Sequence, residues 1–312
     1  MFTFAIKRFA LAALILVVAV TVMFLMIRAV PGDPVTIMLW PRATPELKER
    51  LIAEMALDQS LPKQLLIFFS GLLRGDMGVD VFSGRSVTTI VFEQLPHTLK
   101  LIFSAIAWSA TLGIGLGCYA AAHPNTWIDR AAAAISVSFI AAPAFVVALL
   151  SLLVFAVQLQ WFPAIGVGDG FWDEVHHLVL PSLAIGLSWV GYIARLVRAS
   201  MLEVLGENHI RTARAFGLSE RRIVGIYALR IAILPVVTVI GVGMGFLLSS
   251  AVFTEIVFAR PGLGKLVIDS ITTRNYPIVM GAVLVSTALF VLSTALADLI
   301  NAILDPRART AN

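Results

Sequence analysis

Long apolar runs recur along the chain, separated by short polar connections. The first covers residues 9–27 and contains 19 uncharged residues between Lys7-Arg8 and Arg28. A helix needs about 20 mainly apolar residues to cross a bilayer. Five more runs approach or exceed that length, at residues 101–122, 131–157, 178–194, 231–253 and 278–297. The pattern therefore predicts an all-α polytopic membrane protein with six transmembrane helices.

Composition excludes an ordinary soluble protein. Hydrophobic residues make up 59% of the chain and charged residues 13%, and the mean hydropathy is +0.92. Soluble domains are about 45–50% apolar and about 25% charged. The first run is longer than the roughly 7–15 apolar residues of a signal peptide, and Arg28 follows it instead of a cleavage site. We therefore predict that it is an uncleaved helix. The single cysteine, Cys118, cannot form an internal disulfide.

Lys and Arg are distributed unevenly between alternate connections. The stretches 1–8, 123–130, 195–230 and 298–312 contain two, one, seven and two of them, against none and three in 158–177 and 254–277. Basic residues collect on the cytoplasmic side of membrane proteins. The distribution predicts that both termini are cytoplasmic, and it explains the net charge of +4 without a nucleic-acid partner.

One segment, residues 31–97, is mixed in character, with six basic and eight acidic residues. Thr44 can cap a helix that begins with Pro45 and ends at about residue 55 or 56. A second helix is predicted near residues 62–73. Because loops beyond about 60 residues cross a membrane largely regardless of charge, we predict a small extracytoplasmic domain.

The chain thus divides into a first helix plus extracytoplasmic domain, residues 1–97, and a five-helix core, residues 98–312, with a cytoplasmic elbow at about 199–230. Small residues at four-residue spacing permit close helix packing, either inside the bundle or at a subunit interface: Gly113 with Gly117, and Gly241 with Gly245. Pro143 and Pro235 are expected to kink the third and fifth spans.

Motifs for chemistry in this chain are absent. No G-x-x-x-x-G-K-[ST] phosphate loop and no H-E-x-x-H zinc motif occurs. Ser188 is followed by Trp189, where a membrane serine protease needs glycine. An ion-coupled secondary transporter would need charges at mid-membrane, and the five later runs have none at their centres.

Two polar groups allow alternative interpretations. The cluster Asp173-Glu174-Val175-His176-His177 could bind a metal or form a polar rim before the fourth span, and the rim is the more common arrangement. Asp298, near the inner end of the last run, is either a functional acid or a residue solvated at the interface beside Asn301 and Asp305.

Residues 206–222 form a basic, structured connection between the fourth and fifth spans. Gly206 can end the preceding helix at Leu205, and Asn208 can cap a short helix over residues 209–216. Gly217 can stop that helix in a left-handed turn, and Ser219 can cap the next helix. The sequence therefore predicts a helix–turn–helix elbow.

The elbow helix is amphipathic. Ile210, Ala213 and Phe216 recur on one face, and Arg211 and Arg214 lie together on another. Such a helix can dock into a groove of a cytoplasmic partner or rest on anionic lipid headgroups. The pattern by itself fits lipid at least as well as protein.

Motifs along nearly the whole chain occur in a characteristic order. They are residues 28–34 (RAVPGDP), 57–59 (LDQ), 75–78 (GDMG), 96–99 (PHTL), 211–219 (RTARAFGLS), 222–223 (RI), 234–235 (LP), 255–264 (E-x-x-F-x-x-PGLG), 274–277 (RNYP) and 305–307 (DPR). Together they resemble permease subunits of ABC importers, specifically the dipeptide/oligopeptide/nickel class, with 211–219 similar to the EAA loop. The leading PGDP is similar to the first permease of a heterodimeric pair.

The motifs also depart from the family pattern. Arg211-Thr212-Ala213 stands for the nominal Glu-Ala-Ala, as is common in this class, and the usual Leu-Pro after the loop is displaced to Leu234-Pro235. Asn275 stands where Asp is typical, which leaves any role of an outer acid in doubt.

The resemblance implies a mechanism and a set of partners. Two six-span permeases form the pathway, two cytoplasmic ATPase subunits each receive one elbow, and an extracytoplasmic binding protein delivers solute. ATP and Mg would bind the ATPases, so this chain would be neither an enzyme nor a cofactor carrier. The implied location is the bacterial inner membrane, in contact with lipid.

The implied coupling residues form the elbow: Ile210, Arg211, Thr212, Ala213, Arg214, Ala215, Phe216, Gly217, Leu218 and Ser219. A second stretch, Pro261-Gly262-Leu263-Gly264, resembles an outer loop near the pathway. Di- or oligopeptides are the expected solutes. Nickel, glutathione-like peptides or other small solutes are alternatives.

Overall fold

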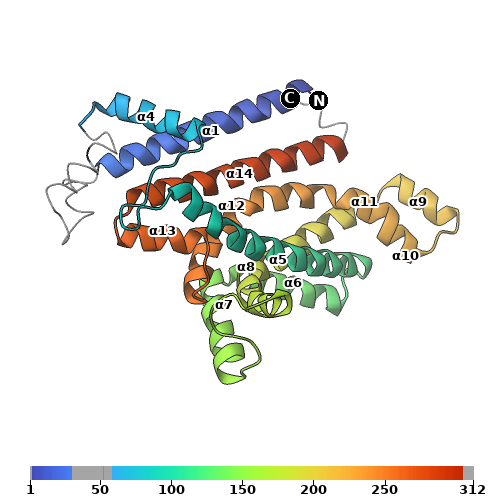
Figure 1. The fold of residues 1–312 in the computed structure, drawn as a ribbon. Helices are drawn as coiled ribbons and strands as arrows, with labels where there is room; N and C mark the ends of the chain where they lie inside the picture. Colours follow the sequence, from blue (N-terminus) through green and yellow to red (C-terminus); the bar gives the residue numbers. More distant parts are fainter. Residues whose placement is uncertain (1, 30–51, 53–57, 305–312) are drawn as a thin grey trace. The chain divides into compact units, whose positions relative to one another are not determined.

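The computed structural model describes the whole chain except residues 1, 30–51, 53–57 and 305–312 (Figure 1). The described part is almost entirely helical, and its one isolated β-bridge joins Val79 to Ser86. This agrees with the predicted all-α fold. The helix predicted to begin at Thr44-Pro45, and the motifs at residues 31–34 and 305–307, lie outside the described residues.

Among the described residues, five helices are long and apolar enough to cross a membrane. They are α1 (Phe2–Ala29), α5 (Val87–Ala122), α8 (Phe171–Leu205), α12 (Leu234–Val257) and α14 (Tyr276–Leu304). Helices α5 and α8 start well before the apolar runs at 101 and 178. The more polar residues that precede each run are also helical, because a helix pairs their backbone N–H and C=O groups. Helix α8 ends at Leu205, as predicted.

The sixth candidate span is broken. Helix α6 (Trp127–Ala141) is followed by α7 (Ala144–Ser151) and the π-helical segment η1 (Leu152–Gln158), and the two parts meet at 96°. The kink predicted in the span over 131–157 is therefore present, and it is sharp enough to divide the span into two helices. Pro143 lacks an N–H and holds Ala142 in an extended conformation, so the helix ends and a new one begins.

At Pro235, where a kink is predicted, the helix is interrupted at Ile233. A short helix α11 (Leu229–Ala232) ends before it, and α12 begins at Leu234 with Pro235 in its first turn. The first-turn N–H groups of a helix have no partner within that helix, so proline is tolerated there.

The chain forms two compact units, and each is described by itself. One comprises residues 1–5, 99–260 and 293–312, and the other residues 6–98 and 261–292. The predicted division at residue 97 concerns the membrane boundary, so it stays a prediction. The second unit contains α4 (Leu61–Leu73), which confirms the helix predicted near 62–73, and α13 (Leu263–Thr272).

A buried polar contact holds the second unit together where the family pattern has an acid. Asn275 is 3% exposed, and its amide donates to the carboxylate of Asp80. Burial opposes ionisation of Asp80, but hydrogen bonds from Ser83, the Phe82 N–H and Asn275 outweigh it and lower the pKa of Asp80. Aspartate at position 275 would set two carboxylates against each other.

Glycines allow the helices of the first unit to approach closely. A Cβ added at Gly117 would lie 2.6 Å from the Ala194 carbonyl oxygen of α8, and one at Gly241 would overlap Ala297 of α14. Gly113 likewise lies against Ile193. These three glycines therefore serve packing inside the chain, one of the two alternatives that the spacing left open.

Candidate functional site

The elbow is a helix–turn–helix, as the sequence predicts. Gly206 ends α8, helix α9 (Asn208–Ala215) follows, and α10 (Glu220–Arg222) leads into the π-helical segment η2 (Ile223–Ala228). Helix α9 begins one residue earlier than predicted, so Glu207 occupies the cap position instead of Asn208. Ser219 caps α10 as predicted, by position and without a side-chain hydrogen bond.

The turn after α9 has the hydrogen bonds of a Schellman motif. The Leu218 N–H donates to the Ala213 carbonyl at 3.3 Å, and the Gly217 N–H donates to the Arg214 carbonyl at 2.9 Å. Gly217 has φ = +77°, the left-handed conformation that this motif requires and that glycine adopts without a Cβ clash. The predicted role of Gly217 as the helix stop is confirmed.

One face of α9 is packed onto the membrane helices. Ile210 is 0% exposed and Ala213 is buried, and both belong to a cluster with Met201 and Val204 of α8 and Ile223 of η2. The elbow is thus anchored on both of the spans that it connects.

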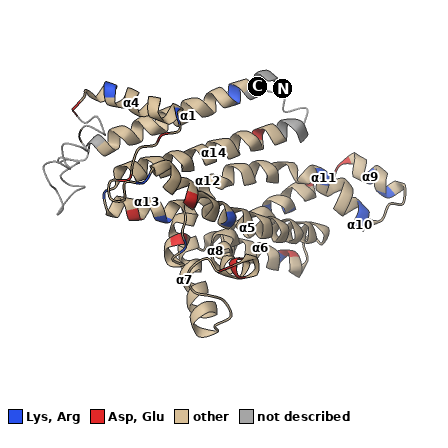
Figure 2. Ribbon diagram, in the orientation of Figure 1, with Lys and Arg blue, Asp and Glu red and all other residues tan. Residues whose placement is uncertain are grey.

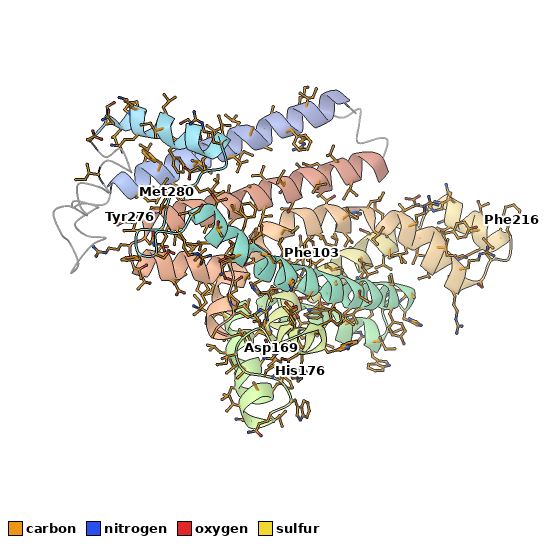
Figure 3. All side chains as sticks on the ribbon, viewed as in Figure 1. Phe103, Asp169, His176, Phe216, Tyr276 and Met280 are labelled. Atoms are coloured by element: carbon orange, nitrogen blue, oxygen red, sulfur yellow. The ribbon has the colours of Figure 1, made fainter. Side chains whose placement is uncertain are left out.

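Phe216 does not join this face, which corrects the prediction. Its side chain is 82% exposed and projects from the tip of the elbow (Figure 3). Helix α9 ends at Ala215, so Phe216 is the C-cap residue and leaves the helical path. A large exposed aromatic ring beside exposed basic residues is typical of a contact with another molecule.

The charges of the elbow are exposed and partly paired. Arg214 forms a two-pronged ion pair with Glu220, with Nε–Oε1 at 2.7 Å and Nη2–Oε2 at 3.3 Å. The hydrogen bond from Arg214 lowers the pKa of Glu220 and raises that of Arg214. Arg211, Arg221 and Arg222 are exposed beside them. Figure 2 shows blue residues gathered over α9 and α10, while the long helices are mainly tan.

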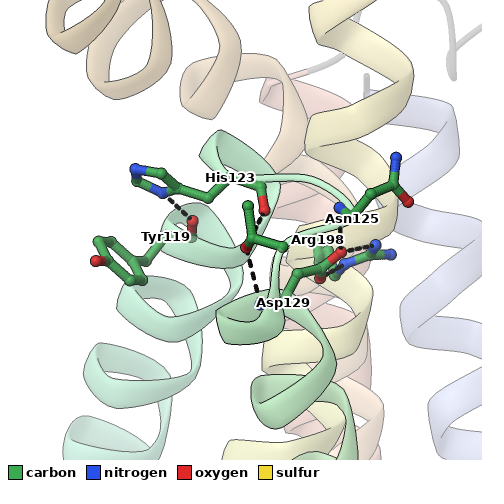
Figure 4. A network of polar contacts seen from close by, with 6 residues as sticks. Tyr119, His123, Asn125, Asp129 and Arg198 are labelled. Atoms are coloured by element: carbon green, nitrogen blue, oxygen red, sulfur yellow. Dashed lines mark hydrogen bonds and ion pairs between the residues drawn. The ribbon is translucent and has the colours of Figure 1, made fainter.

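A second ion pair, which the sequence pattern did not predict, lies at the base of the elbow. Asp129 in the first turn of α6 accepts hydrogen bonds from Arg198 Nε and, at 2.7 Å, from Nη2 (Figure 4). The backbone N–H of Asn125 donates to the same carboxylate at 3.0 Å. Thr126 and Asp129 have the T-x-x-D spacing of a helix start, which is the signal that could have revealed this site.

A cavity of about 1030 Å³ lies beside the elbow. Arg214, Glu220 and Arg221 line one part of it, and Cys118 and Tyr119 of α5 line another. The elbow is therefore supported on one side by packing and has space on the other.

The second predicted stretch, Pro261-Gly262-Leu263-Gly264, starts helix α13. Its last three residues are buried, and the Leu263 N–H donates to Thr98 Oγ1 at 2.8 Å. The stretch is thus part of the packing of its own unit, and its role near a pathway stays a prediction.

Arg260, just before that stretch, is 0% exposed, and its Nη1 lies 3.4 Å from the Gly166 carbonyl. Burial lowers the pKa of Arg260, against the opposing effect of the charges of Glu174 and Glu255. In the first unit, the charged side chain of Arg260 is thus buried, whereas the charged side chains of the elbow are exposed.

The candidate metal residues lie at the start of α8. His176 Nε2 is 3.0 Å from the Trp161 carbonyl, and His177 Nδ1 is 2.8 Å from the Asp173 carbonyl. In the described part of the chain, no three His, Cys, Asp or Glu residues gather as ligands would. Asp298 is half-buried in α14.

Comparison with known proteins identifies the fold. Residues 113–310 match the family described as binding-protein-dependent transport system inner membrane component, and residues 1–102 match its N-terminal companion. The chain belongs to this permease family. The class expected from the motifs, the dipeptide/oligopeptide/nickel class of ABC importer permeases, is confirmed by this match together with the relatives described next, and so is the inner-membrane location.

Two relatives match this permease over most of its length. A glutathione transport system permease of Escherichia coli is 36% identical over 310 residues, covering 99% of each chain. A probable peptide ABC transporter permease of Sinorhizobium fredii is 36% identical over 289 residues, covering 92% of each. A chain of the MetNI methionine ABC transporter superposes with a TM-score of 0.55 at 18% identity, covering 69% of this chain and 96% of that chain. This last likeness concerns the fold alone.

Proposed function

We propose that this permease forms half of a transmembrane pathway for short peptides, together with a second, homologous permease. An extracytoplasmic binding protein delivers the peptide. Two cytoplasmic ATPase subunits, which bind ATP and Mg, dock against the elbows of the two permeases. This chain hydrolyses nothing itself.

The observation that carries the proposal is the rigid elbow with an exposed tip. Ile210 and Ala213 anchor α9 on the spans, the Schellman turn at Gly217 fixes its end, and Phe216 remains free to enter a groove. An ATPase that closes on ATP can push such a lever as one body. A helix that only rests on lipid needs neither the internal anchoring nor the fixed turn.

Photo-crosslinking at Phe216 distinguishes the two partners of the elbow. Benzoylphenylalanine replaces Phe216 in the assembled transporter, with Leu153 on η1, which is also exposed, as the matched control position. We expect crosslinks to an ATPase subunit from position 216 alone. Adducts with phospholipid only, at both positions, would refute docking.

Uptake into proteoliposomes tests the substrate. We expect ATP-driven, binding-protein-dependent uptake of radiolabelled trialanine. Glutathione is the second candidate, because the Escherichia coli relative carries that name. Uptake of nickel with neither peptide transported would overturn the peptide assignment while preserving the importer assignment.

A further inference from the structure

The cavity beside the elbow has a charged end and an apolar end. Arg214, Glu220 and Arg221 of the elbow line the charged end. Along α5, the lining runs from Ala122, the last residue of that helix, back to Gly115 inside its apolar run. At a rise of about 1.5 Å per residue, these positions span about 10 Å of helix. The cavity therefore extends from the charged elbow into the apolar part of the spans.

Two glycines of the lining leave this cavity open. Gly115 of α5 and Gly225 of η2 are exposed, and a Cβ added at either would meet no atom within 4 Å. Gly113 and Gly117, on either side of Gly115, differ, because an added Cβ there would lie 2.8 Å and 2.6 Å from atoms of α8. Glycine is unfavourable inside a helix. No packing contact accounts for it at position 115, where a side chain would instead fill the cavity.

The charged end carries an excess of positive charge. Arg214 and Glu220 neutralise each other in their ion pair, and Arg221 has no ion pair among the described residues. His123 lies in the same lining, with its Nδ1 3.0 Å from the Tyr119 carbonyl oxygen. The described lining contains no Asp and no second Glu. Its charge is therefore complementary to an anionic group.

The two ends together define the occupant. An acidic loop of a soluble protein, or a free phosphate ion, would satisfy Arg221 but leave the apolar end beside Gly115 and Leu202 unfilled. A phospholipid has both parts, since its phosphate is anionic and its acyl chains are apolar. Basic pockets between membrane helices on the cytoplasmic side are typical sites for anionic lipid headgroups.

We propose that this cavity binds an anionic phospholipid of the membrane, with the phosphate beside Arg221 and an acyl chain along α5 toward Gly115. Phe216 is outside the lining, so the tip of the elbow stays accessible to another partner while the lipid is bound. The elbow thus has a lipid face and a separate protein face. This site goes beyond the proposed function and does not depend on which solute is transported.

Native mass spectrometry of the assembled transporter tests the proposal. The complex is purified in detergent and titrated with dioleoylphosphatidylglycerol, and the fraction of complexes that retain lipid is measured at each concentration. Dioleoylphosphatidylethanolamine, which has no net charge, and glycerol 1-phosphate, which has no acyl chain, are the comparison ligands. We expect phosphatidylglycerol to be retained, phosphatidylethanolamine to be retained less, and glycerol phosphate not to compete.

Adjacent arginines provide a matched pair for the charged end. We expect Arg221→Gln to weaken retention of phosphatidylglycerol about fivefold, the typical contribution of one basic residue near an anionic lipid. Arg222 is also exposed but outside the lining, so Arg222→Gln should change retention little. Equal losses in the two variants would overturn the cavity assignment. Competition by glycerol phosphate would assign the charged end to a soluble phosphate instead.

Filling the cavity tests the apolar end. We expect Gly115→Leu to reduce retention of phosphatidylglycerol several-fold, and Gly115→Ala to reduce it less. Gly225→Leu fills the cavity from η2, so the conclusion does not depend on one substitution. The melting temperature should not fall in these variants, because the added Cβ meets no atom. Full retention in both leucine variants would refute the proposal. Loss of the ATPase subunits from Gly115→Leu complexes, with no lipid retained by the wild type, would assign the cavity to an ATPase segment.

Discussion

Two ion pairs of the same chemistry, one at the base of the elbow and one at its tip, differ in burial. Asp129 has a side chain that is 6% exposed and Arg198 one that is 31% exposed. At the tip of the elbow, Glu220 is 63% exposed and Arg214 42%. Both pairs are two-pronged. Geometry alone therefore does not distinguish them.

The difference in burial decides what each pair can do. Water can replace either partner of the exposed pair, so such pairs contribute at most about 1 kcal/mol. The carboxylate of Asp129 is almost inaccessible to water, so it depends on the hydrogen bonds from Arg198 and from the N–H of Asn125. The inner pair thus joins α6 firmly to α8, and the outer pair only steadies the turn.

Breaking the inner pair should have the largest effect, and an asymmetric one. Arg198→Ala leaves a nearly buried carboxylate unpaired, whereas Asp129→Ala leaves an arginine that can still reach water. We expect both variants to lower the amount of assembled transporter several-fold, and Arg198→Ala the more. Quantitative immunoblotting of solubilised complexes measures this. The reverse order would refute the burial argument.

Gly217→Asp should uncouple the transporter without removing it from the membrane. A residue with a Cβ resists the left-handed conformation by roughly 1–2 kcal/mol, although Asn and Asp tolerate it best. Gly217→Asn is therefore the matched control for backbone strain. We expect the Asp variant to lose trialanine uptake and binding-protein stimulation of ATPase activity, and the Asn variant to retain much of both. Wild-type coupling in the Asp variant would contradict the role of this turn in docking.

Phe216→Ala should affect coupling and leave stability unchanged, because the ring is exposed. We expect ATPase binding to weaken by about tenfold or more, as for an aromatic anchor in an interface. Co-purification of the ATPase subunits with the permease measures this. Ile210→Ala is the contrasting variant, since loss of a buried side chain costs about 2–5 kcal/mol and lowers the melting temperature. Equal melting temperatures for both variants would contradict the conclusion that Ile210 is on a buried face of the elbow and Phe216 on an exposed one.

Glu220→Gln should have the smallest effect. The pKa of Glu220 is lowered by Arg214, so the ion pair stabilises the fold above the ordinary glutamate pKa, and this contribution disappears as the pH falls through the lowered value. We expect a small decrease in melting temperature at pH 7 and none in acid. Added salt should reduce the decrease at pH 7. A decrease as large as that of Arg198→Ala would overturn the comparison.

Much of the fold could be predicted because the bilayer imposes simple rules. Five of the six expected spans are single helices over the apolar runs. The elbow residues Gly206, Gly217 and Ser219 occupy the cap and turn positions that their chemistry predicts. Pro143 was recognised, but a proline alone does not reveal whether a helix bends slightly or breaks by 96°. That outcome depends on what the second half packs against.

The sequence by itself determined the membrane class, the course of most spans and the existence of a capped elbow, because hydrophobicity and local backbone preferences act over a few residues. Only the tertiary structure decided that Phe216 leaves the face that Ile210 shares, and that Asp129 reaches Arg198, 69 residues away. It also brought residues of α8 and α12 together around one cavity. Such partners lie far apart in the chain, and packing between helices, which no local pattern encodes, brings them together.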